Sequence, residues 1–126
     1  MRILVIDDSA ASCWFISDCL GGAGHEVFEA ENGKEGIKIF KRIHCDLVIT
    51  DIIMPEMEGI ETIRALRKID PAIKIIAISG GGKQSAQDYL NIASALGANL
   101  TLQKPITQEQ LLCAIEIVNV EKGECK

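Results

Sequence analysis

Short runs of branched apolar residues alternate along this chain with longer segments whose apolar residues recur every three or four positions. Such continuous runs are typical of buried parallel strands, which have no polar face. The longer segments predict amphipathic helices that pack on a sheet. The predicted strands are 3–6, 25–30, 47–51, 73–78 and 100–102, and a predicted helix follows each of them.

Residues that cap helices support these boundaries. Ser9 and Asn32 stand at the start of the first two helices, where their side-chain oxygens can accept hydrogen bonds from free backbone N–H groups. Thr107 and Gln110 have the spacing of a capping box at the start of the last helix. These signals indicate five strand–helix units joined by short connections.

This alternation predicts one α/β domain over residues 1–120, followed by a polar tail over residues 121–126. Regular strand–helix alternation implies a parallel sheet with helices on both faces. Because crossovers are right-handed and the central strands read as buried, we expect a five-stranded, doubly wound sheet of the flavodoxin-like (βα)5 type with strand order 2-1-3-4-5.

Composition narrows the class of protein. The chain has 126 residues, of which 48% are hydrophobic, and a formal net charge of -5. The length suits one domain with a real core, and the negative charge argues against a nucleic-acid partner. No apolar run approaches the length of a membrane span, and the first residues turn acidic too soon for a signal peptide. We therefore expect a cytoplasmic protein without a membrane partner.

The cysteines do not form a metal or redox motif, because none has CxxC spacing and no histidine completes a ligand set. We expect free thiols, as is usual in a reducing compartment. Cys13, Cys19 and Cys113 lie in helical patterns, where cysteine behaves as a small hydrophobe. The remaining two are Cys45 and Cys125.

Trp14 lies off the apolar stripe of the first helix, and two interpretations are open. It is either half exposed and available to a partner, or packed flat on the surface of its own domain. Only the first interpretation predicts a function.

Chemically active side chains follow the carboxyl ends of the predicted strands, which is where open α/β sheets bind ligands. Asp7, Asp8 and Asp51 follow the first and third strands, which are neighbours in the expected order. Adjacent carboxylates repel one another unless a cation lies between them, and Mg²⁺ favours such oxygen ligands. Ser79 and Lys104, at the ends of the fourth and fifth strands, could hold the oxygens of a phosphoryl group. Asp51 could then be an aspartyl nucleophile.

Each of these residues also has an ordinary structural explanation. An Asp-Asp pair after a strand most often caps a helix, a serine at a strand end usually caps something, and a Lys-Pro pair is usually on the surface. The glycines at 80–82 lack the GxxxxGK[ST] pattern of a phosphate loop. The functional interpretation therefore depends on all five residues occurring at strand ends of one sheet.

Taken together, these signals resemble a response regulator receiver domain of two-component signalling. The resemblance covers residues 3–120, nearly the whole chain, and its motifs are highly specific as a set. The matching residues are Asp7-Asp8 after the first strand, Asp51 with Met54-Pro55 and Gly59, Ser79 at the end of the fourth strand, Gly97-Ala98 before the fifth, and Lys104-Pro105 after it.

The resemblance assigns roles to the acids. It implies that Asp51 is the phosphoacceptor. It also implies that Asp7, Asp8 and Asp51 hold Mg²⁺, with the backbone carbonyl of Ile53 as a further ligand.

The resemblance further implies that Ser79 and Lys104 bind the phosphoryl oxygens. The donor would be a phosphohistidine on a sensor histidine kinase or a histidine phosphotransfer protein. A receiver of this family catalyses only its own phosphorylation and dephosphorylation, so the chain would be a signalling module rather than an enzyme with turnover. A downstream effector would bind the face formed by the fourth helix, the fifth strand and the fifth helix.

Two features depart from the family pattern. Thr101 occupies the position in the fifth strand where an aromatic switch residue is usual. We expect Ser79 to move toward the phosphoryl group nonetheless, with a smaller surface change or one that runs through Tyr89. The glycines at 80–82 make the following loop unusually free, and we expect that loop to order on phosphorylation.

Two other functions fit parts of the pattern. A Mg²⁺-dependent aspartyl phosphatase of the haloacid dehalogenase type needs a DxD motif, but Ile53 stands where the second aspartate would be. A phosphorylation-independent pseudo-receiver scaffold would lack one of the acids or the lysine, and all of these are present. Residue identity alone leaves the scaffold alternative open.

Overall fold

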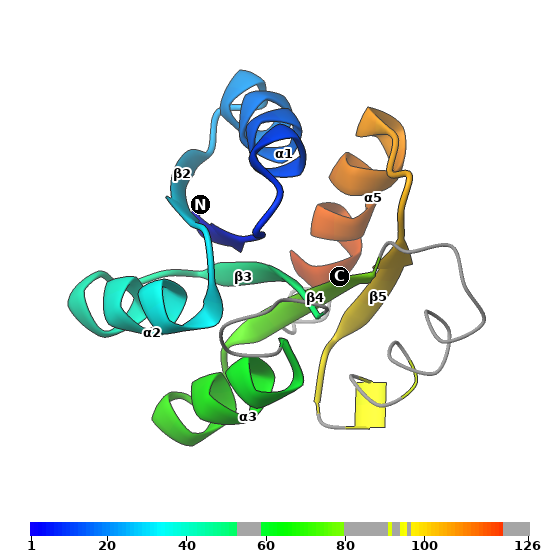
Figure 1. The fold of residues 1–126 in the computed structure, drawn as a ribbon. Helices are drawn as coiled ribbons and strands as arrows, with labels where there is room; N and C mark the ends of the chain where they lie inside the picture. The colour runs from blue at the N-terminus through cyan, green and yellow to red at the C-terminus, as the bar shows by residue number, and fades with distance from the viewer. Residues whose placement is uncertain (53–58, 80–90, 92–93, 96, 120–126) are drawn as a thin grey trace.

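The computed structural model describes residues 1–52, 59–79, 91, 94–95 and 97–119, which are drawn in colour in Figure 1. Its centre is a parallel sheet of five strands in the order β2-β1-β3-β4-β5. The strands are β1 (Arg2–Ile6), β2 (Glu26–Ala30), β3 (Leu47–Asp51), β4 (Lys74–Ser79) and β5 (Leu100–Gln103). The predicted strand order is confirmed, and the observed bounds differ from the predicted ones by one residue at most.

Helices cover both faces of this sheet. Those with assigned bounds are α1 (Ala10–Gly22), α2 (Gly33–Arg42), α3 (Gly59–Ile69) and α5 (Gln108–Asn119). In Figure 1, α1 and α5 lie on one side of the sheet, and α2 and α3 lie on the other. The helix predicted between β4 and β5 lies mostly outside the described residues, as does the predicted tail. No helix in the described part of the chain is long and apolar enough to cross a membrane.

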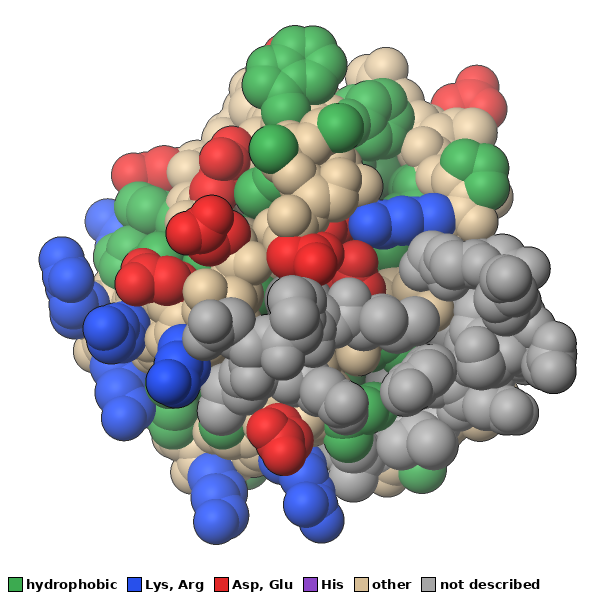
Figure 2. Space-filling view, in the orientation of Figure 1, with side chains coloured by type: hydrophobic (Ala, Val, Ile, Leu, Met, Phe, Trp, Pro, Cys, Tyr) green, Lys and Arg blue, Asp and Glu red, His purple; other side chains and the backbone are tan. Residues whose placement is uncertain are grey.

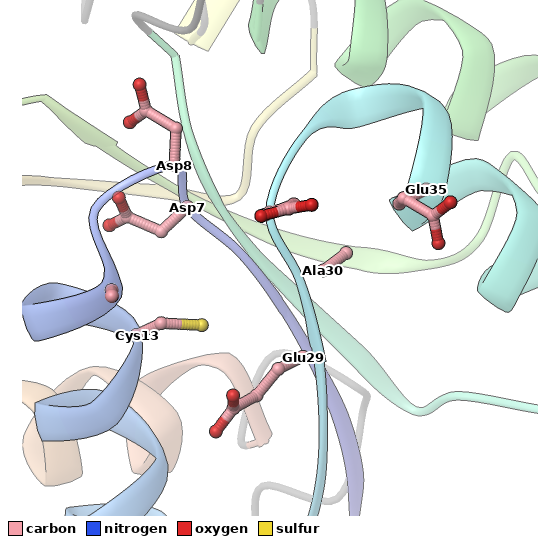
Figure 3. A pocket seen from close by; sticks show the side chains of 8 residues that line it. Asp7, Asp8, Cys13, Glu29, Ala30 and Glu35 are labelled. Carbon is pink, nitrogen blue, oxygen red and sulfur yellow. The ribbon is translucent and has the colours of Figure 1, made fainter.

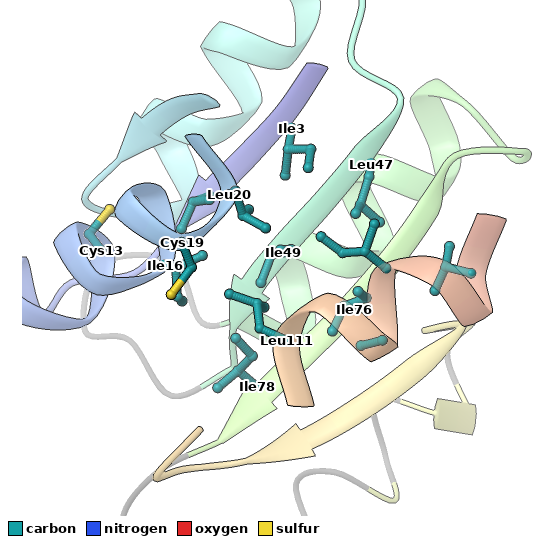
Figure 4. Packing of buried hydrophobic residues seen from close by; sticks show 14 residues of the cluster. Ile3, Cys13, Ile16, Cys19, Leu20, Leu47, Ile49, Ile76, Ile78 and Leu111 are labelled. Atoms are coloured by element: carbon teal, nitrogen blue, oxygen red, sulfur yellow. The ribbon is translucent and has the colours of Figure 1, made fainter. Parts of the chain in front are cut away.

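Both faces of the central strands are buried, which explains their continuous apolar sequences. In β1, Leu4 and Ile6 belong to the cluster under α2 and α3, whereas Ile3 and Val5 belong to the cluster under α1 and α5. All four side chains are at most 1% exposed. Figure 4 shows the second cluster, in which Leu111 from α5 packs over the strands. A doubly wound sheet needs this alternation, because each of its faces carries a helical layer.

The predicted helix caps are present. The side-chain oxygens of Ser9 and Asn32 accept hydrogen bonds from backbone N–H groups three residues later, at 3.2 Å and 2.8 Å. The backbone N–H of Thr107 donates to Oε1 of Gln110 at 3.0 Å, and the N–H of Gln110 donates to Oγ1 of Thr107 at 3.1 Å. The last pair is the reciprocal capping box that the sequence predicts.

The start of α3 packs directly against the end of β3. A Cβ atom added at Gly59 would overlap the Cα atom of Ile52 and the carbonyl oxygen of Asp51. The N–H of Gly59 donates to the carbonyl oxygen of Ile52 at 3.2 Å. This contact holds the backbone that follows Asp51 and leaves room only for glycine.

Arg67, in the last turn of α3, ties three segments together at the amino end of the sheet. Its guanidinium donates to the carbonyl oxygens of Pro71, Ile73 and Gly97, and to Oδ1 of Asn99 at 3.0 Å. Burial lowers the pKa of Arg67 below its usual value. The residue anchors the starts of β4 and β5 to α3.

The structure corrects one prediction about the cysteines. The four described cysteines are free thiols, as expected; Cys13, Cys19 and Cys45 are buried, whereas Cys113 is exposed. The buried stripe of α5 runs through Ala114 instead, so the prediction that Cys113 behaves as a small hydrophobe of a helix face is wrong. The physical reason is helix phase, because residues one position apart point about 100° away from each other.

Trp14 is 66% exposed on α1. This exposure favours the interpretation that the indole is available to a partner, because a side chain packed flat on its own domain would lose most of its accessible surface.

Candidate functional site

Three carboxylates meet at the carboxyl end of the sheet, between β1 and β3. These strands are neighbours in register, with Ile6 opposite Thr50, so Asp7 and Asp51 follow side by side. One carboxylate oxygen from each of Asp7, Asp8 and Asp51 can be chosen so that all three lie within 4.8 Å of one another. The structure thus brings together the three acids that the strand order predicts to converge.

The three acids differ in their exposure to solvent. Asp7 and Asp51 are 2% and 5% exposed, whereas Asp8 is exposed. The N–H of Asp7 donates to the carbonyl oxygen of Ala30 at 3.0 Å, and Oδ1 of Asp7 accepts from the N–H of Ser9 at 2.9 Å. Because Ser9 itself caps α1, the explanation of the Asp pair as the helix cap does not apply.

Lys104 places its ammonium group between two of these carboxylates. Its Nζ lies 3.0 Å from Oδ2 of Asp7 and 3.2 Å from Oδ2 of Asp51. Burial by itself lowers the pKa of Lys104, but the carboxylates of Asp51 and Asp7 outweigh burial, and the pKa is raised. Lys104 is therefore charged at neutral pH.

Ser79 ends β4, the strand next to β3, and is 0% exposed. Its carbonyl oxygen accepts a hydrogen bond from the backbone N–H of Lys104 at 2.8 Å, which fixes the backbone at Lys104 beside β4. Ser79 and Lys104 thus lie at the same end of the sheet as the acids. Ile53, whose carbonyl is the expected further ligand, lies outside the described residues.

The predicted departure in the fifth strand is visible in part. Thr101 stands in β5 opposite Ala77 of β4 and is half-buried. The glycines at 80–82 and Tyr89 lie outside the described residues. The expected movement of Ser79 and the ordering of the following loop therefore stay predictions.

The charges in this site do not balance. Three carboxylates gather around one ammonium group, so an excess of negative charge remains. Two of the acids are almost fully buried, where like charges repel more strongly than in water. Carboxylate oxygens are hard ligands of the kind that Mg²⁺ takes in small numbers while keeping several waters. The donor set therefore fits a hard divalent cation.

A cavity of about 380 Å³ opens beside these acids, between the start of α1 and the end of β2 (Figure 3). Further carboxylates line it, from Glu29, Glu31 and Glu35. Sequence reasoning missed these glutamates because none of them belongs to a motif. The one available signal was the position of Glu29 and Glu31 at the carboxyl end of the second strand.

Cys13 also lines this cavity, and Figure 3 shows its sulfur pointing into the hollow above Glu29. Burial, followed by the charges of Glu29 and Asp7, raises the pKa of Cys13 to about 11. The thiol therefore stays protonated at neutral pH, whereas a reactive cysteine needs a lowered pKa. Cys13 is a structural residue of the cavity wall.

The fold and the site together define a class of protein. A sheet of order 2-1-3-4-5 has its ligand site where the strand order reverses, between the first and third strands, and the acids lie there. A solved response regulator receiver domain protein from Clostridium thermocellum has this architecture. It superposes with a TM-score of 0.87 at 35% sequence identity, covering 96% of this chain and 95% of that chain.

Sequence comparisons narrow the class to a family. The family model of the response regulator receiver domain matches residues 3–116. The chemotaxis protein CheY of Thermotoga maritima is 37% identical over 119 residues, covering 94% of this chain and 97% of that protein. The CheY of Bacillus subtilis is 39% identical over 115 residues, covering 90% and 93%. This chain therefore belongs to the response regulator receiver family.

Proposed function

We propose that Asp51 accepts a phosphoryl group from a phosphohistidine of a sensor histidine kinase or a histidine phosphotransfer protein. One observation carries this proposal. The nearly buried carboxylate of Asp51 clusters with those of Asp7 and Asp8, and one oxygen from each of the three lies within 4.8 Å of the others. Oδ2 of Asp51 also lies 3.2 Å from Nζ of Lys104. A nucleophile, anionic metal ligands and a cation for the incoming group are thereby gathered at one point.

In the transfer, a carboxylate oxygen of Asp51 forms a bond to phosphorus while the bond from phosphorus to the donor imidazole nitrogen breaks. The imidazole keeps the electron pair of that bond and takes a proton from solvent. Lys104 offsets the negative charge of the phosphoryl oxygens. The hydroxyl of Ser79, at the end of the adjacent strand, donates a hydrogen bond to one of them.

Asp7, Asp8 and Asp51 would hold Mg²⁺, with the carbonyl of Ile53 as a further ligand. When bound, the ion supplies charge stabilisation for the transferring group. Before the phosphoryl group arrives, Lys104 is the counter-ion that holds Asp7 and Asp51 together. The chain acts on itself, so its role is that of a switch rather than of an enzyme with turnover.

The effector surface is proposed to include β5 and α5. An apolar groove of about 430 Å³ lies there, lined by Leu100 and Leu102 from β5 and by Cys113 and Ile117 from α5. Ile117 is 42% exposed. Exposed apolar side chains around a groove are typical of protein-binding surfaces.

Incubation with acetyl phosphate and Mg²⁺, followed by intact mass measurement, tests this function. We expect one phosphoryl adduct on the wild-type chain, none on Asp51→Asn, and none when EDTA removes the ion. Asp18→Asn, which neutralises an exposed acid on α1, is the matched control and should still form the adduct. An adduct that survives in Asp51→Asn would refute the assignment. A wild-type chain that stays unmodified would favour the pseudo-receiver scaffold.

A further inference from the structure

Positive charge is concentrated on the two helices that cover one face of the sheet. α2 and α3 hold seven of the 13 Lys and Arg residues but only two of the 18 Asp and Glu residues. Figure 2 shows Lys and Arg side chains along the left and lower edges of the view, over these helices, whereas Asp and Glu side chains gather mostly in the upper half. The molecule thus has a basic side and an acidic side.

Six of these seven cations are exposed; the seventh, Arg67, is turned inward. We call the exposed set the basic surface: Lys34, Lys38, Lys41, Arg42, Arg64 and Lys68. α2 and α3 pack beside each other on the same cluster of core residues, so the set forms one continuous surface. Within the described residues, no carboxylate lies within ion-pair distance of any of the six.

The spacing of these cations stabilises the helices only in part, through Glu35 with Lys38 on α2 and Glu61 with Arg64 on α3. Lys34, Lys38 and Arg42 follow one another at four-residue steps along α2, and Arg64 and Lys68 do the same on α3. Like charges at this spacing are destabilising. Lys34 also stands in the first turn of α2, where the helix dipole disfavours a cation. Only the cations in the last turns complement the dipole, so fold stability does not explain the whole set.

We propose that the basic surface binds an acidic segment of a partner protein, at a site separate from Asp51. A nucleic acid fits less well, because a long polyanion would also meet the acidic side of a chain whose net charge is -5. The described residues of α2 and α3 also expose no aromatic ring for base stacking. A membrane fits less well too, because Ile69, 41% exposed, is the one large apolar side chain that these helices expose.

An acidic segment matches both the size and the chemistry of this surface. A short helix or extended segment with carboxylates every three or four residues can face the cations of both helices without reaching the acidic side of the domain. Complementary charges of this kind set specificity and association rate. Binding of an acidic segment here is a second role, beyond the proposed phosphoacceptor function, and it does not depend on phosphorylation of Asp51.

The probe is a fluorescein-labelled synthetic peptide of repeating Glu and Ala, titrated with the full chain and followed by fluorescence anisotropy at about 0.15 M salt. We expect saturable binding that weakens at least about tenfold in Lys38→Glu combined with Arg64→Glu. The control is Arg2→Glu combined with Lys122→Glu, which changes the net charge by the same amount. Arg2 is on β1, outside the basic surface, and Lys122 lies outside the described residues. That control should stay within about threefold of the wild type.

A second pair of variants separates charge from folding. Lys38→Arg combined with Arg64→Lys keeps both charges and should bind like the wild type, and far-UV circular dichroism checks that every variant is folded. The proposal is overturned if the two Glu double variants weaken binding equally, or if the wild type does not bind the peptide. It is also overturned if phosphatidylserine vesicles or a DNA duplex bind more tightly than the peptide, or if sedimentation shows that a second copy of the chain occupies the surface.

Discussion

Arg67 and Lys104 are partly buried cations at opposite ends of the sheet, and they have different kinds of partner. At the amino end, Arg67 donates to neutral carbonyl and amide oxygens, and burial lowers its pKa. At the carboxyl end, Lys104 lies between the carboxylates of Asp7 and Asp51, which raise its pKa against the effect of burial. One domain therefore uses a buried cation in two ways.

The difference separates stability from function. The hydrogen bonds of Arg67 join neighbouring segments through neutral oxygens, and the nearby carboxylate of Asp70 offsets the guanidinium charge. This arrangement needs no further ion. The cluster around Lys104 keeps more negative than positive charge, so it is complete only when a further cation is bound. Functional sites commonly break the local rule that buried charges are balanced, and the rest of the fold compensates for the lost stability.

The largest expected effect comes from closing the space at the carboxyl end. Gly59→Ala should lower the free energy of unfolding by about 3 kcal/mol, because the added methyl group overlaps backbone atoms of Ile52 and Asp51. Gly22→Ala, at the end of α1, meets no atom within 4 Å and should raise it by about 0.5 kcal/mol. Urea unfolding followed by circular dichroism measures both. Equal effects of the two substitutions would contradict this account of the β3–α3 junction.

The next effect tests the amino end. Arg67→Ala should lower the free energy of unfolding by about 2 kcal/mol, because buried carbonyl oxygens lose their charged donor. Arg64→Ala removes an exposed arginine from the same helix and should change it by less than about 0.5 kcal/mol. Phosphorylation of Asp51 by acetyl phosphate should remain in both variants. A loss of the adduct in Arg67→Ala, with the protein folded, would show that the two ends are not independent.

The smallest effect tests the carboxyl end by pH. Lys104→Met should lower stability by about 1 kcal/mol at neutral pH in EDTA, because two carboxylates lose their counter-ion. The folded-state pKa of Lys104 is raised, so its contribution is complete below the unfolded value of about 10.4 and is lost as pH rises through the folded value. The difference between wild type and variant should therefore be constant from about pH 7 to 9 and shrink above about pH 10.5. A difference that grows with pH would refute this sign.

The sequence predicts what depends on local patterns. Strand and helix types, the caps at Ser9 and Thr107, and the convergence of the acids follow from periodicity and from the adjacency of the first and third strands. Arg67 could not be predicted, because its bond to Gly97 joins residues 30 apart and depends on side-chain direction. The exposure of Cys113 depends on the phase of a helix that has apolar residues on more than one side.

The distance along the chain between the site residues has a consequence for synthesis. Asp7 and Lys104 are 97 residues apart, and the strand that leads to Lys104 is the last one and lies at the edge of the sheet. A chain growing from its amino terminus therefore exposes the acids of β1 and β3 well before their ammonium partner leaves the ribosome. The carboxylates of Asp7 and Asp51 gain their ammonium partner only when β5, the last strand of this sheet, docks beside β4.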